Sequence, residues 1–552
     1  MTAAYDPRFT THEVTNQAPP LTPYNVYTSD VALGEAVAHF GGGWATDSLA
    51  AFGAVVGGEM MELAVQANQH KPVLKPFDRY GNRIDLVAFH PAYHRLMTLG
   101  LKHGAANFSW RHAETAGAHV ARAALLYLQT QADQGTSCPI TMTHAALPVI
   151  RQAPTLAATW RGRLLSTEYD PRHVPAWEKV GNTIGMGMTE KQGGSDVRAN
   201  TTRATAIGPD GGGALYELVG HKWFMSAPMS DAFLVLAQTA RGISCFLLPR
   251  FRPDGTLNAM CIQRLKDKLG DWSNASAEVE FQGALAWLVG EEGRGIATIL
   301  EMVALTREDC MLGSAGIMRQ ALAEAIHHAR HRSAFGKRLV NQPLMQMVLA
   351  DLSLEAEAAM ALALRVARAI DASARDPRAA AFARIATAIG KYWICKRTPA
   401  FVNEAQECLG GAGYVEESNL PRLYRQAPLN SIWEGSGNIQ CLDVLRALAR
   451  EPATREAVLM ELKSAQGGHP LLDTEIIALG AELDNTVDLE KRARWLVERL
   501  AMALQAATLV HLGNPLVADS FCAARLGAHH GRSYGAISAT LPAEALIVRA
   551  LK

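Results

Sequence analysis

The chain has 552 residues, of which 49% are hydrophobic and 19% are charged, a composition typical of a globular protein and not of a disordered one. The length is enough for about three or four domains. Lysine plus arginine equals aspartate plus glutamate at 53 each, so the formal net charge of zero excludes an overall field that would draw the protein to nucleic acid or to an anionic membrane.

Residues 1–28 look extended, because three prolines between positions 19 and 23 favour polyproline-like geometry. Ser29 and Asp30 then offer an N-cap to an alanine-rich helix. From there to about residue 180 the pattern is mainly helical, and Gly117–Gln131 carries apolar residues at helical spacing. We therefore predict a helical N-terminal domain.

The stretch Met186–Asp196 reads MGMTEKQGGSD. Its three glycines allow the backbone to approach a ligand closely. The hydroxyls of Thr189 and Ser195, with free backbone N–H groups, could donate hydrogen bonds to a flat heteroaromatic ring or to a phosphate. An ordinary surface loop of glycine and serine explains the composition equally well.

From about residue 181 to 285 the sequence changes to short β-type runs separated by turn residues, which predicts a compact antiparallel sheet domain. The strands cluster and do not alternate with helices, so a parallel α/β fold is excluded. Trp223, near the end of the first of these runs, could form a wall for a planar cofactor or pack within the sheet. The predicted strands are Tyr216–Phe224, Ala232–Thr239, Ile243–Leu248 and Ala275–Phe281.

After Gly295 the pattern is helical again, over about 296–332, 342–372, 379–409 and 437–450. A further hundred residues follow, in which Leu489–Leu509 shows plain helical periodicity. The predicted fold is therefore mainly α with a central β domain. Its expected parts are an N-terminal extended segment and helical domain (1–180), a β domain (181–290), a four-helix bundle (291–450) and a C-terminal helical domain (451–552).

Glu434 lies within NSIWEGSGNIQ, between the bulky Trp433 and three small residues, directly before a predicted helix. One interpretation is an ordinary charge at a helix N-terminus. The other is a general base whose pKa rises because the tryptophan excludes water. The spacing alone leaves both open.

Two further segments have a basic or glycine-rich character. In His331–Leu339, Arg332 and two other basic residues surround Phe335, which suits either a pyrophosphate clamp or a solvated basic turn. The glycines of Glu407–Tyr414 suit a helix C-cap, and they would also let the backbone approach a dinucleotide.

The eight cysteines are scattered, without a CxxC pair or a cysteine–histidine spacing typical of zinc, and the adjacent His327 and His328 face different sides of their helix. We expect no bound metal. Reduced thiols in a chain of this size favour a cytoplasmic location. The polar N-terminus and the lack of a run of about twenty apolar residues argue against a signal peptide and a membrane partner.

In their order and separations, MTEKQGGSD, KWFMS, RSAFGK, LGGAGY and IWEGSGNI resemble the motifs of the acyl-CoA dehydrogenase superfamily. Wider blocks resemble its AidB branch, over about residues 20–450, and the C-terminal segment also matches that branch in length and helical character. These blocks are SCPITMTHAA (Ser137–Ala146), RLKDKLG (Arg264–Gly270) and SIWEGSGNIQCLDVLR (Ser431–Arg446).

The resemblance implies an FAD-binding protein with a helical domain, an antiparallel β domain and a four-helix bundle. It assigns Arg332, Phe335, Gly410 and Gly411 to the FAD of a neighbouring subunit, so a homotetramer is expected. The residues that it assigns to FAD in the same subunit are Met186, Met188, Thr189, Gly194, Ser195, Trp223, Phe224, Met225, Ser226, Trp433, Ser436, Gly437 and Asn438.

The reaction implied by the resemblance is α,β-dehydrogenation of an acyl thioester. Glu434 would remove the α-proton while the β-hydride moves to the flavin. Some members of the family place the base before an arginine on the helix that follows the β domain. That residue here is Thr306, so Glu434 keeps the role, and the nearby Glu308 and Asp309 are out of register.

The AidB branch is associated with protection of DNA from alkylating agents, with binding of double-stranded DNA through the C-terminal domain, and with weak acyl-CoA dehydrogenase activity. Residues 451–552 carry ten basic and twelve acidic side chains, a net charge of −2, whereas phosphate contacts require a positive surface. The candidate DNA-binding residues are Arg446, Lys491, Arg492, Arg494 and Arg525. A metabolic dehydrogenase of short or branched acyl-CoA, and a C-terminal domain that serves only as a subunit interface, are the alternatives.

Overall fold

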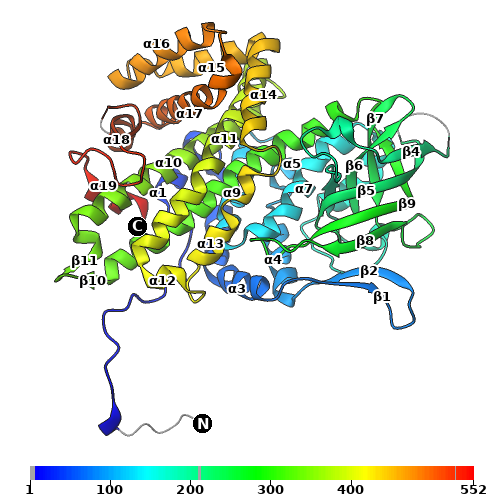
Figure 1. Ribbon diagram of the computed structural model, residues 1–552, viewed down its shortest axis with the longest axis horizontal. Coiled ribbons are helices and arrows are strands. Elements are labelled where there is room, and N and C mark those ends of the chain that lie inside the picture. The colour runs from blue at the N-terminus through cyan, green and yellow to red at the C-terminus, as the bar shows by residue number, and fades with distance from the viewer. Residues whose placement is uncertain (1–6, 209–212, 529) are drawn as a thin grey trace.

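The computed structural model describes residues 7–208, 213–528 and 530–552, so the first six residues of the expected extended segment lie outside the described residues. Figure 1 shows the strands of the β domain at one side of the molecule, long helices through its middle, and the C-terminal helices along another edge. An extended N-terminal arm points away from the body of the molecule, whereas the C-terminus lies against that body (Figure 1). This arrangement is the mainly α fold with a β domain that the sequence predicts.

The N-terminal part is helical, as expected. Asp30 caps the first helix, because its carboxylate accepts a hydrogen bond of 3.1 Å from the Leu33 N–H. The helices are α1 (Val31–His39), α2 (Thr46–Val55), α3 (Met61–Gln69), α4 (Pro91–Lys102), α5 (Phe108–Arg111), α6 (Ala118–Ala132), α7 (Gln134–Ile150) and α8 (Pro154–Leu164).

A two-stranded hairpin of β1 (Val73–Phe77) and β2 (Arg83–Ala88) interrupts these helices. The sequence pattern does not predict this hairpin, because its strands are short and rich in charged residues and proline. Packing of Val87 into the core of the β domain fixes the hairpin in place.

One continuous helical stretch, Gly43–Gln69, is long and apolar enough by length and composition to cross a membrane. Its Phe52, Val56 and Met60 side chains are fully buried in the hydrophobic core that the N-terminal helices share with the bundle. Packing against α6 and α4 therefore accounts for its apolar face.

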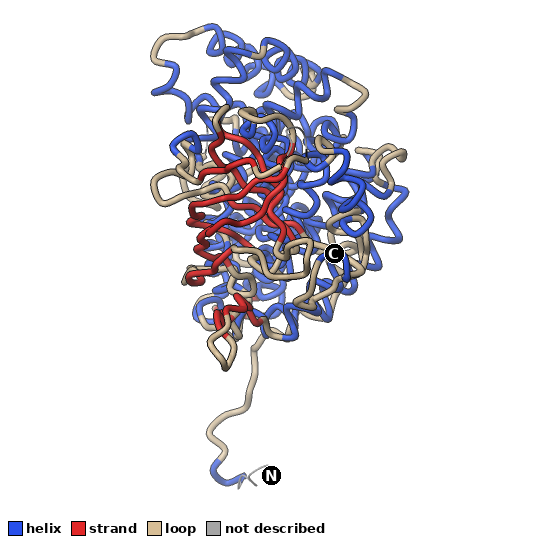
Figure 2. Tube along the Cα trace, turned by 90° about the vertical axis from the view of Figure 1, so that its right-hand side faces the viewer, coloured by secondary structure: helices blue, strands red, loops and turns tan. Residues whose placement is uncertain are grey.

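The β domain is a single sheet in which the pairings β6–β7, β7–β9, β9–β5, β5–β4 and β4–β6 close a circuit. Most pairs are antiparallel, and the four predicted strands are all present, while β3 and β4 each pair with β6 in parallel. Figure 2 shows the strands gathered together with helices around them. The strands are β3 (Ile184–Gly187), β4 (Arg203–Ala206), β5 (Leu215–Ser226), β6 (Ala232–Thr239), β7 (Gly242–Pro249), β8 (Met260–Leu265) and β9 (Ser276–Val289).

Four long helices follow at the predicted positions: α9 (Gly295–His331), α10 (Pro343–Ala372), α11 (Pro377–Leu409) and α14 (Gly437–Arg450). Helix α9 is central, since it packs against α10, α11, α6 and α7. Short elements connect them, namely the hairpin of β10 (Ser333–Ala334) and β11 (Lys337–Arg338), α12 (Gly411–Tyr414) and α13 (Leu420–Gln426).

The C-terminal segment folds as a helical tail domain that packs on the bundle. Its longest helix carries the expected apolar face, on which Ala493, Leu496, Leu500 and Leu504 are buried. That helix contacts α10, α11 and α14, and the last helix returns to α10 and α1. The elements are α15 (Pro452–Ser464), α16 (Pro470–Asp484), α17 (Leu489–Leu512), α18 (Pro515–Arg525) and α19 (Ala543–Ala550).

Candidate functional site

Glu434 lies on the turn between α13 and α14 in a backbone conformation that side chains rarely adopt, with φ of +58°, and Gly435 follows at +97°. Donors from other helices hold this turn. The Arg307 Nε and Gln440 Nε2 donate to the Glu434 carbonyl at 2.9 and 3.1 Å. The Lys391 Nζ donates to the carbonyl of Gly435 and, at 2.7 Å, to that of Trp433. The unusual backbone is thus fixed from α9, α11 and α14 together.

The Glu434 carboxyl group is held beside Thr306 of α9, whose Oγ1 donates to Oε2 at 2.7 Å. Burial raises the pKa of Glu434, although the Thr306 hydrogen bond and the charges of Lys391 and Arg307 oppose the rise. A carboxyl group with a raised pKa suits a general base. Thr306 occupies the rival base position that the sequence analysis weighed, and here it serves as a hydrogen-bond donor to Glu434.

The other two acids of that helix are engaged elsewhere. Glu308 accepts from His119 at 2.8 Å, and Asp309 is bound by the Arg122 guanidinium, with one contact of 2.8 Å. All four side chains are buried between α6 and α9. Their positions agree with the expectation that neither acid replaces Glu434.

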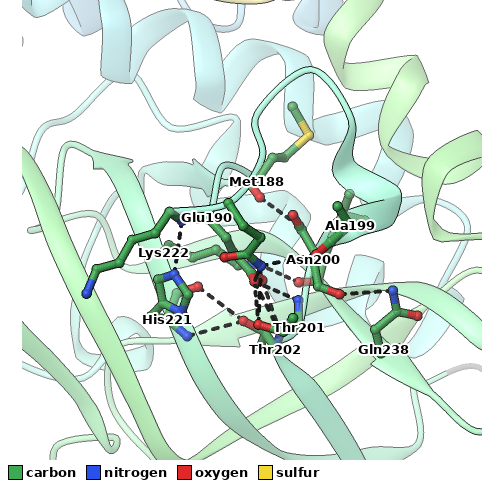
Figure 3. A network of polar contacts seen from close by, with 12 residues as sticks. Met188, Glu190, Ala199, Asn200, Thr201, Thr202, His221, Lys222 and Gln238 are labelled. Carbon is green, nitrogen blue, oxygen red and sulfur yellow. Dashed lines mark hydrogen bonds and ion pairs between the residues drawn. The ribbon is translucent and has the colours of Figure 1, made fainter.

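A buried ion pair ties the loop that begins at Met188 to the β domain (Figure 3). The Lys222 Nζ lies 2.7 Å from the Glu190 Oε1, and neither side chain is exposed to solvent. The second oxygen of Glu190 accepts from the Thr201 N–H at 2.7 Å. The Trp223 N–H donates to the Thr189 carbonyl at 2.8 Å, so the loop and β5 are joined on both sides of the pair.

Burial alone would raise the pKa of Glu190, but the Lys222 ammonium and hydrogen bonds from Thr202 and Thr201 outweigh it and hold the pKa at about 2. This ion pair is not among the interactions predicted from the sequence. The sequence nevertheless contains a signal for it, because the two residues lie inside the motifs MTEKQGGSD and HKWF. Each is a charged residue within or beside a strand that is expected to be buried.

A side chain at Gly194 would be tightly placed, because the loop folds back on Thr189 there. A Cβ at Gly194 would lie 3.1 Å from the Thr189 Oγ1. Gly194 and Ser195 are exposed, whereas Met188 and Thr189 are half-buried. The loop therefore presents backbone groups and hydroxyls to a ligand at the surface of the β domain.

At the end of β5, Trp223 and Ser226 are half-buried and Phe224 is 49% exposed, so all three remain accessible to a ligand. The Lys266 ammonium lies 3.3 Å from the centroid of the Trp223 ring. Met225 differs, because its side chain is fully buried in the core of the β domain and leaves only the backbone available.

The loop, the strand and the Glu434 turn converge around Cys138 of α7. Met186, Met188 and Trp433 pack against the hydrophobic cluster that contains Cys138. Burial raises the pKa of the Cys138 thiol to about 12, and the charge of Glu434 and a hydrogen bond with Ser226 are among the smaller influences on it. The structure therefore brings these sequence-predicted residues into one site.

The remaining predicted residues lie elsewhere. Phe335 is 98% exposed, and Gly410 ends α11 with φ of +61° and is also exposed. The Arg332 guanidinium donates to the Asn16 carbonyl at 2.5 Å. Figure 1 places the β10–β11 hairpin and α12, which begins at Gly411, at the end of the bundle remote from the β domain. These residues form a second group, apart from Trp223.

The candidate DNA-binding residues have unequal surroundings. Arg446 is exposed on α14, and Lys491 is exposed beside Asp488, 2.9 Å away. Arg525 is half-buried and bonded to Asp351 and Glu355, and Arg492 is bonded to Glu482 at 2.6 Å. Arg494 donates to Asn438. Among the residues that the structure describes, no residue of the bundle engages the exposed side chains of Arg446 and Lys491.

The site suits a cofactor rich in hydrogen-bond acceptors. Ser436 is the N-cap of α14, and its side chain makes no capping hydrogen bond, so its hydroxyl and the first N–H groups of the helix are available. Thr189, Ser195 and Ser226 add hydroxyls from the β domain. These donors fit FAD. Within the described ranges, no group of three His, Cys, Asp or Glu side chains could hold a metal ion.

Three family models match the chain in succession. The adaptive response protein AidB N-terminal domain matches residues 16–171, the acyl-CoA dehydrogenase middle domain matches 185–284, and the acyl-CoA dehydrogenase C-terminal domain matches 293–449. Together they cover the helical, β and bundle regions.

Individual relatives agree with these matches. AidB of Escherichia coli (strain K12) is 48% identical over 94% of this chain and 95% of its own length. Acyl-CoA dehydrogenase family member 11 of Caenorhabditis elegans is 32% identical over 73% of this chain and 66% of its own length. The solved structure of C. elegans ACDH-11 in complex with C11-CoA superposes with a TM-score of 0.84 at 26% identity, covering 100% of this chain and 95% of that one.

Proposed function

The chain belongs to the acyl-CoA dehydrogenase family and to its AidB branch, and we propose that it oxidises an acyl-CoA thioester with Glu434 as the general base. It is an FAD-dependent oxidoreductase of the acyl-CoA dehydrogenase type. The observation that carries the assignment of the base is the Glu434 carboxyl group, which has a raised pKa and lies on a turn fixed by donors from three helices.

The residues around Glu434 divide the work of proton abstraction. Thr306 binds Oε2 and thereby orients the carboxylate, which leaves Oε1 to take the α-proton of the thioester. Lys391 and Arg307 hold the backbone of the turn, so the Glu434 carboxylate keeps its position when it is ionised. Trp433, the preceding residue, packs against the hydrophobic cluster that contains Cys138 and Leu305 and so helps to keep water from the turn. FAD, held by the loop at Thr189 and by the start of α14, supplies the hydride acceptor when it is bound.

Anaerobic titration with a panel of acyl-CoA thioesters tests this activity. We expect at least one short, branched or medium-length acyl-CoA to bleach the flavin absorbance, and the panel should include isovaleryl-CoA and C11-CoA. The inclusion of C11-CoA follows from the complex described for ACDH-11. A flavin that dithionite reduces but that no member of the panel bleaches would contradict the proposal.

We also propose that the protein is a homotetramer in which each FAD contacts two subunits. Phe335, Leu344 and Tyr414 are 98%, 84% and 83% exposed, and such side chains at one end of the bundle favour contact with a neighbour. Arg332, Phe335, Gly410 and Gly411 would then reach the FAD of that neighbour. The eight buried, free cysteines favour a cytoplasmic location.

As the finer part of the function, we propose a role in the response to DNA alkylation, with binding of double-stranded DNA at Arg446 and Lys491. The match to the AidB N-terminal domain supports the role. The acids that neutralise Arg492 and Arg525 oppose a large phosphate-binding surface, which favours the alternative of a metabolic acyl-CoA dehydrogenase without a DNA function.

The two alternatives differ in a mobility-shift titration against duplex DNA at increasing salt. With about two phosphates neutralised, the slope of log K against log salt should be about −2, because each contact contributes about −0.9. Replacing both Arg446 and Lys491 with glutamine should abolish the slope. If the wild-type protein does not bind DNA at low salt, the metabolic alternative stands.

A further inference from the structure

Helix α17 carries four lysine and arginine residues, and three of them form ion pairs with acids of the tail domain. The exception is Arg494, which has no carboxylate within ion-pair distance in residues 7–208, 213–528 and 530–552. The three ion pairs join Lys491 to Asp488 at 2.9 Å, Arg492 to Glu482 at 2.6 Å, and Arg499 to Glu475 at 2.7 Å.

Arg494 instead reaches out of the tail domain to the start of α14. Its Nε donates to the Asn438 Oδ1 at 2.8 Å, across 56 residues of sequence. A Cβ built on Gly437 would lie 3.7 Å from the Arg494 Nη2 and 3.4 Å from the Tyr392 ring. The guanidinium group therefore lies beside the first residues of α14, next to the turn that carries Glu434.

This contact has a chemical consequence for Asn438. Arginine carries donors only, so the amide oxygen of Asn438 must face it, and the amide Nδ2 is left to donate to something else. Arg494 and Asn438 are both exposed, so a ligand can reach them. The uncapped N–H groups that follow Ser436, the Asn438 Nδ2 and the guanidinium charge all favour an anionic, acceptor-rich ligand.

We infer that Arg494 is a positioning residue of the FAD site: it fixes the Asn438 amide and adds positive charge where the phosphate-bearing part of FAD binds. The inference rests on the proposed function, which assigns Ser436, Gly437 and Asn438 to FAD. It makes the tail domain part of the cofactor site and removes Arg494 from the candidate DNA-binding surface.

The test is FAD affinity of the full-length protein, stripped of cofactor and titrated with FAD by flavin fluorescence. Arg494→Met should raise the FAD Kd by about tenfold, as expected for loss of a hydrogen bond that involves a charged group. Arg494→Lys should recover part of the affinity, because it restores charge without the fixed fork. Arg450→Met, which removes the same charge from the other end of α14, should leave the Kd unchanged.

Thermal melting of the variants distinguishes a role of Arg494 in FAD binding from a merely structural role. The FAD-free Arg494→Met protein should melt at the wild-type temperature, while the rise in melting temperature on adding FAD should shrink. The double variant of Asn438→Ala and Arg494→Met should bind FAD no more weakly than the worse single variant, since the two residues act together.

The outcomes also separate this inference from the proposed function. If Asn438→Ala weakens FAD binding and Arg494→Met does not, the role of Arg494 is overturned and the site stands. If Asn438→Ala has no effect on the FAD Kd, the assignment of the α14 start to FAD is itself wrong. If Arg450→Met weakens FAD binding equally, the effect of Arg494 comes from net charge alone, and the inference is overturned.

Discussion

Glu434→Gln is expected to slow flavin reduction by an acyl-CoA by about 10²–10⁴-fold, the usual contribution of a positioned general base. Glutamine keeps the shape and can still accept the hydrogen bond from Thr306, but it cannot accept the α-proton. Because the donors Arg307, Lys391 and Gln440 bind backbone carbonyls of the turn, the turn should keep its geometry. FAD should stay bound, and stopped-flow absorbance under anaerobic conditions measures the rate.

Thr306→Val is the matched control, because it removes one hydroxyl and keeps the carboxylate. The Thr306 hydrogen bond lowers the pKa of Glu434, so its loss should raise that pKa further. The base works only when ionised, and the acid side of the pH–rate profile should therefore move to higher pH. An unchanged profile in Thr306→Val, or full activity in Glu434→Gln, would assign the base to another residue.

The sequence predicts the long helices well because their pattern is local. Helices α9, α10, α11 and α14 lie within a few residues of the expected ranges, since apolar periodicity and the flanking glycines and prolines mark them. Strands β3, β4 and β8 are missed, because each is only four to six residues long and too short for a pattern to emerge. The hairpin of β1 and β2 is missed for the same reason.

The residues of the site likewise divide into those that the sequence predicts and those that only the fold reveals. Glu434 is found from its neighbours in the sequence, but the groups that hold it come from afar: Arg307 is 127 residues away and Lys391 is 42 residues from the Trp433 carbonyl that it binds. Charge counting placed Arg494 with DNA, whereas its partner is an amide of another domain. Composition gives the number of charges, and only the fold decides which of them are already neutralised.

Lys222→Met is expected to have the largest effect on stability. Its partner Glu190 is as buried as Lys222 itself, so the substitution leaves a buried carboxylate without its ammonium. Breaking a buried pair in this way costs about 3–5 kcal/mol of unfolding free energy. Lys191→Met, at the exposed residue that follows Glu190, should change the unfolding free energy by less than about 0.5 kcal/mol. Urea unfolding followed by tryptophan fluorescence measures both.

The stability that the Glu190–Lys222 pair contributes should change with pH in a definite direction. The pKa of Glu190 is held at about 2 in the folded state, below its ordinary value of 4.5. The stability that it contributes is therefore present above pH 4.5 and is lost as the pH falls towards 2. Without the Lys222 ammonium, burial raises the folded-state pKa of Glu190, and protonation of the carboxylate then relieves the unpaired charge. The loss of stability of the variant relative to the wild type should therefore be largest near neutral pH and should shrink as the pH falls.

Two further results follow from what the pair does for the loop. Removing both charges, with Glu190→Gln beside Lys222→Met, should restore part of the stability, because no unpaired charge then remains buried. FAD affinity should not recover with it, since Glu190 also accepts from the Thr201 N–H and so shapes the loop that carries Thr189 and Gly194. If the double variant regains both stability and FAD binding, the pair does not position the loop for FAD. If Lys222→Met unfolds at the wild-type urea concentration, the pair contributes nothing to stability.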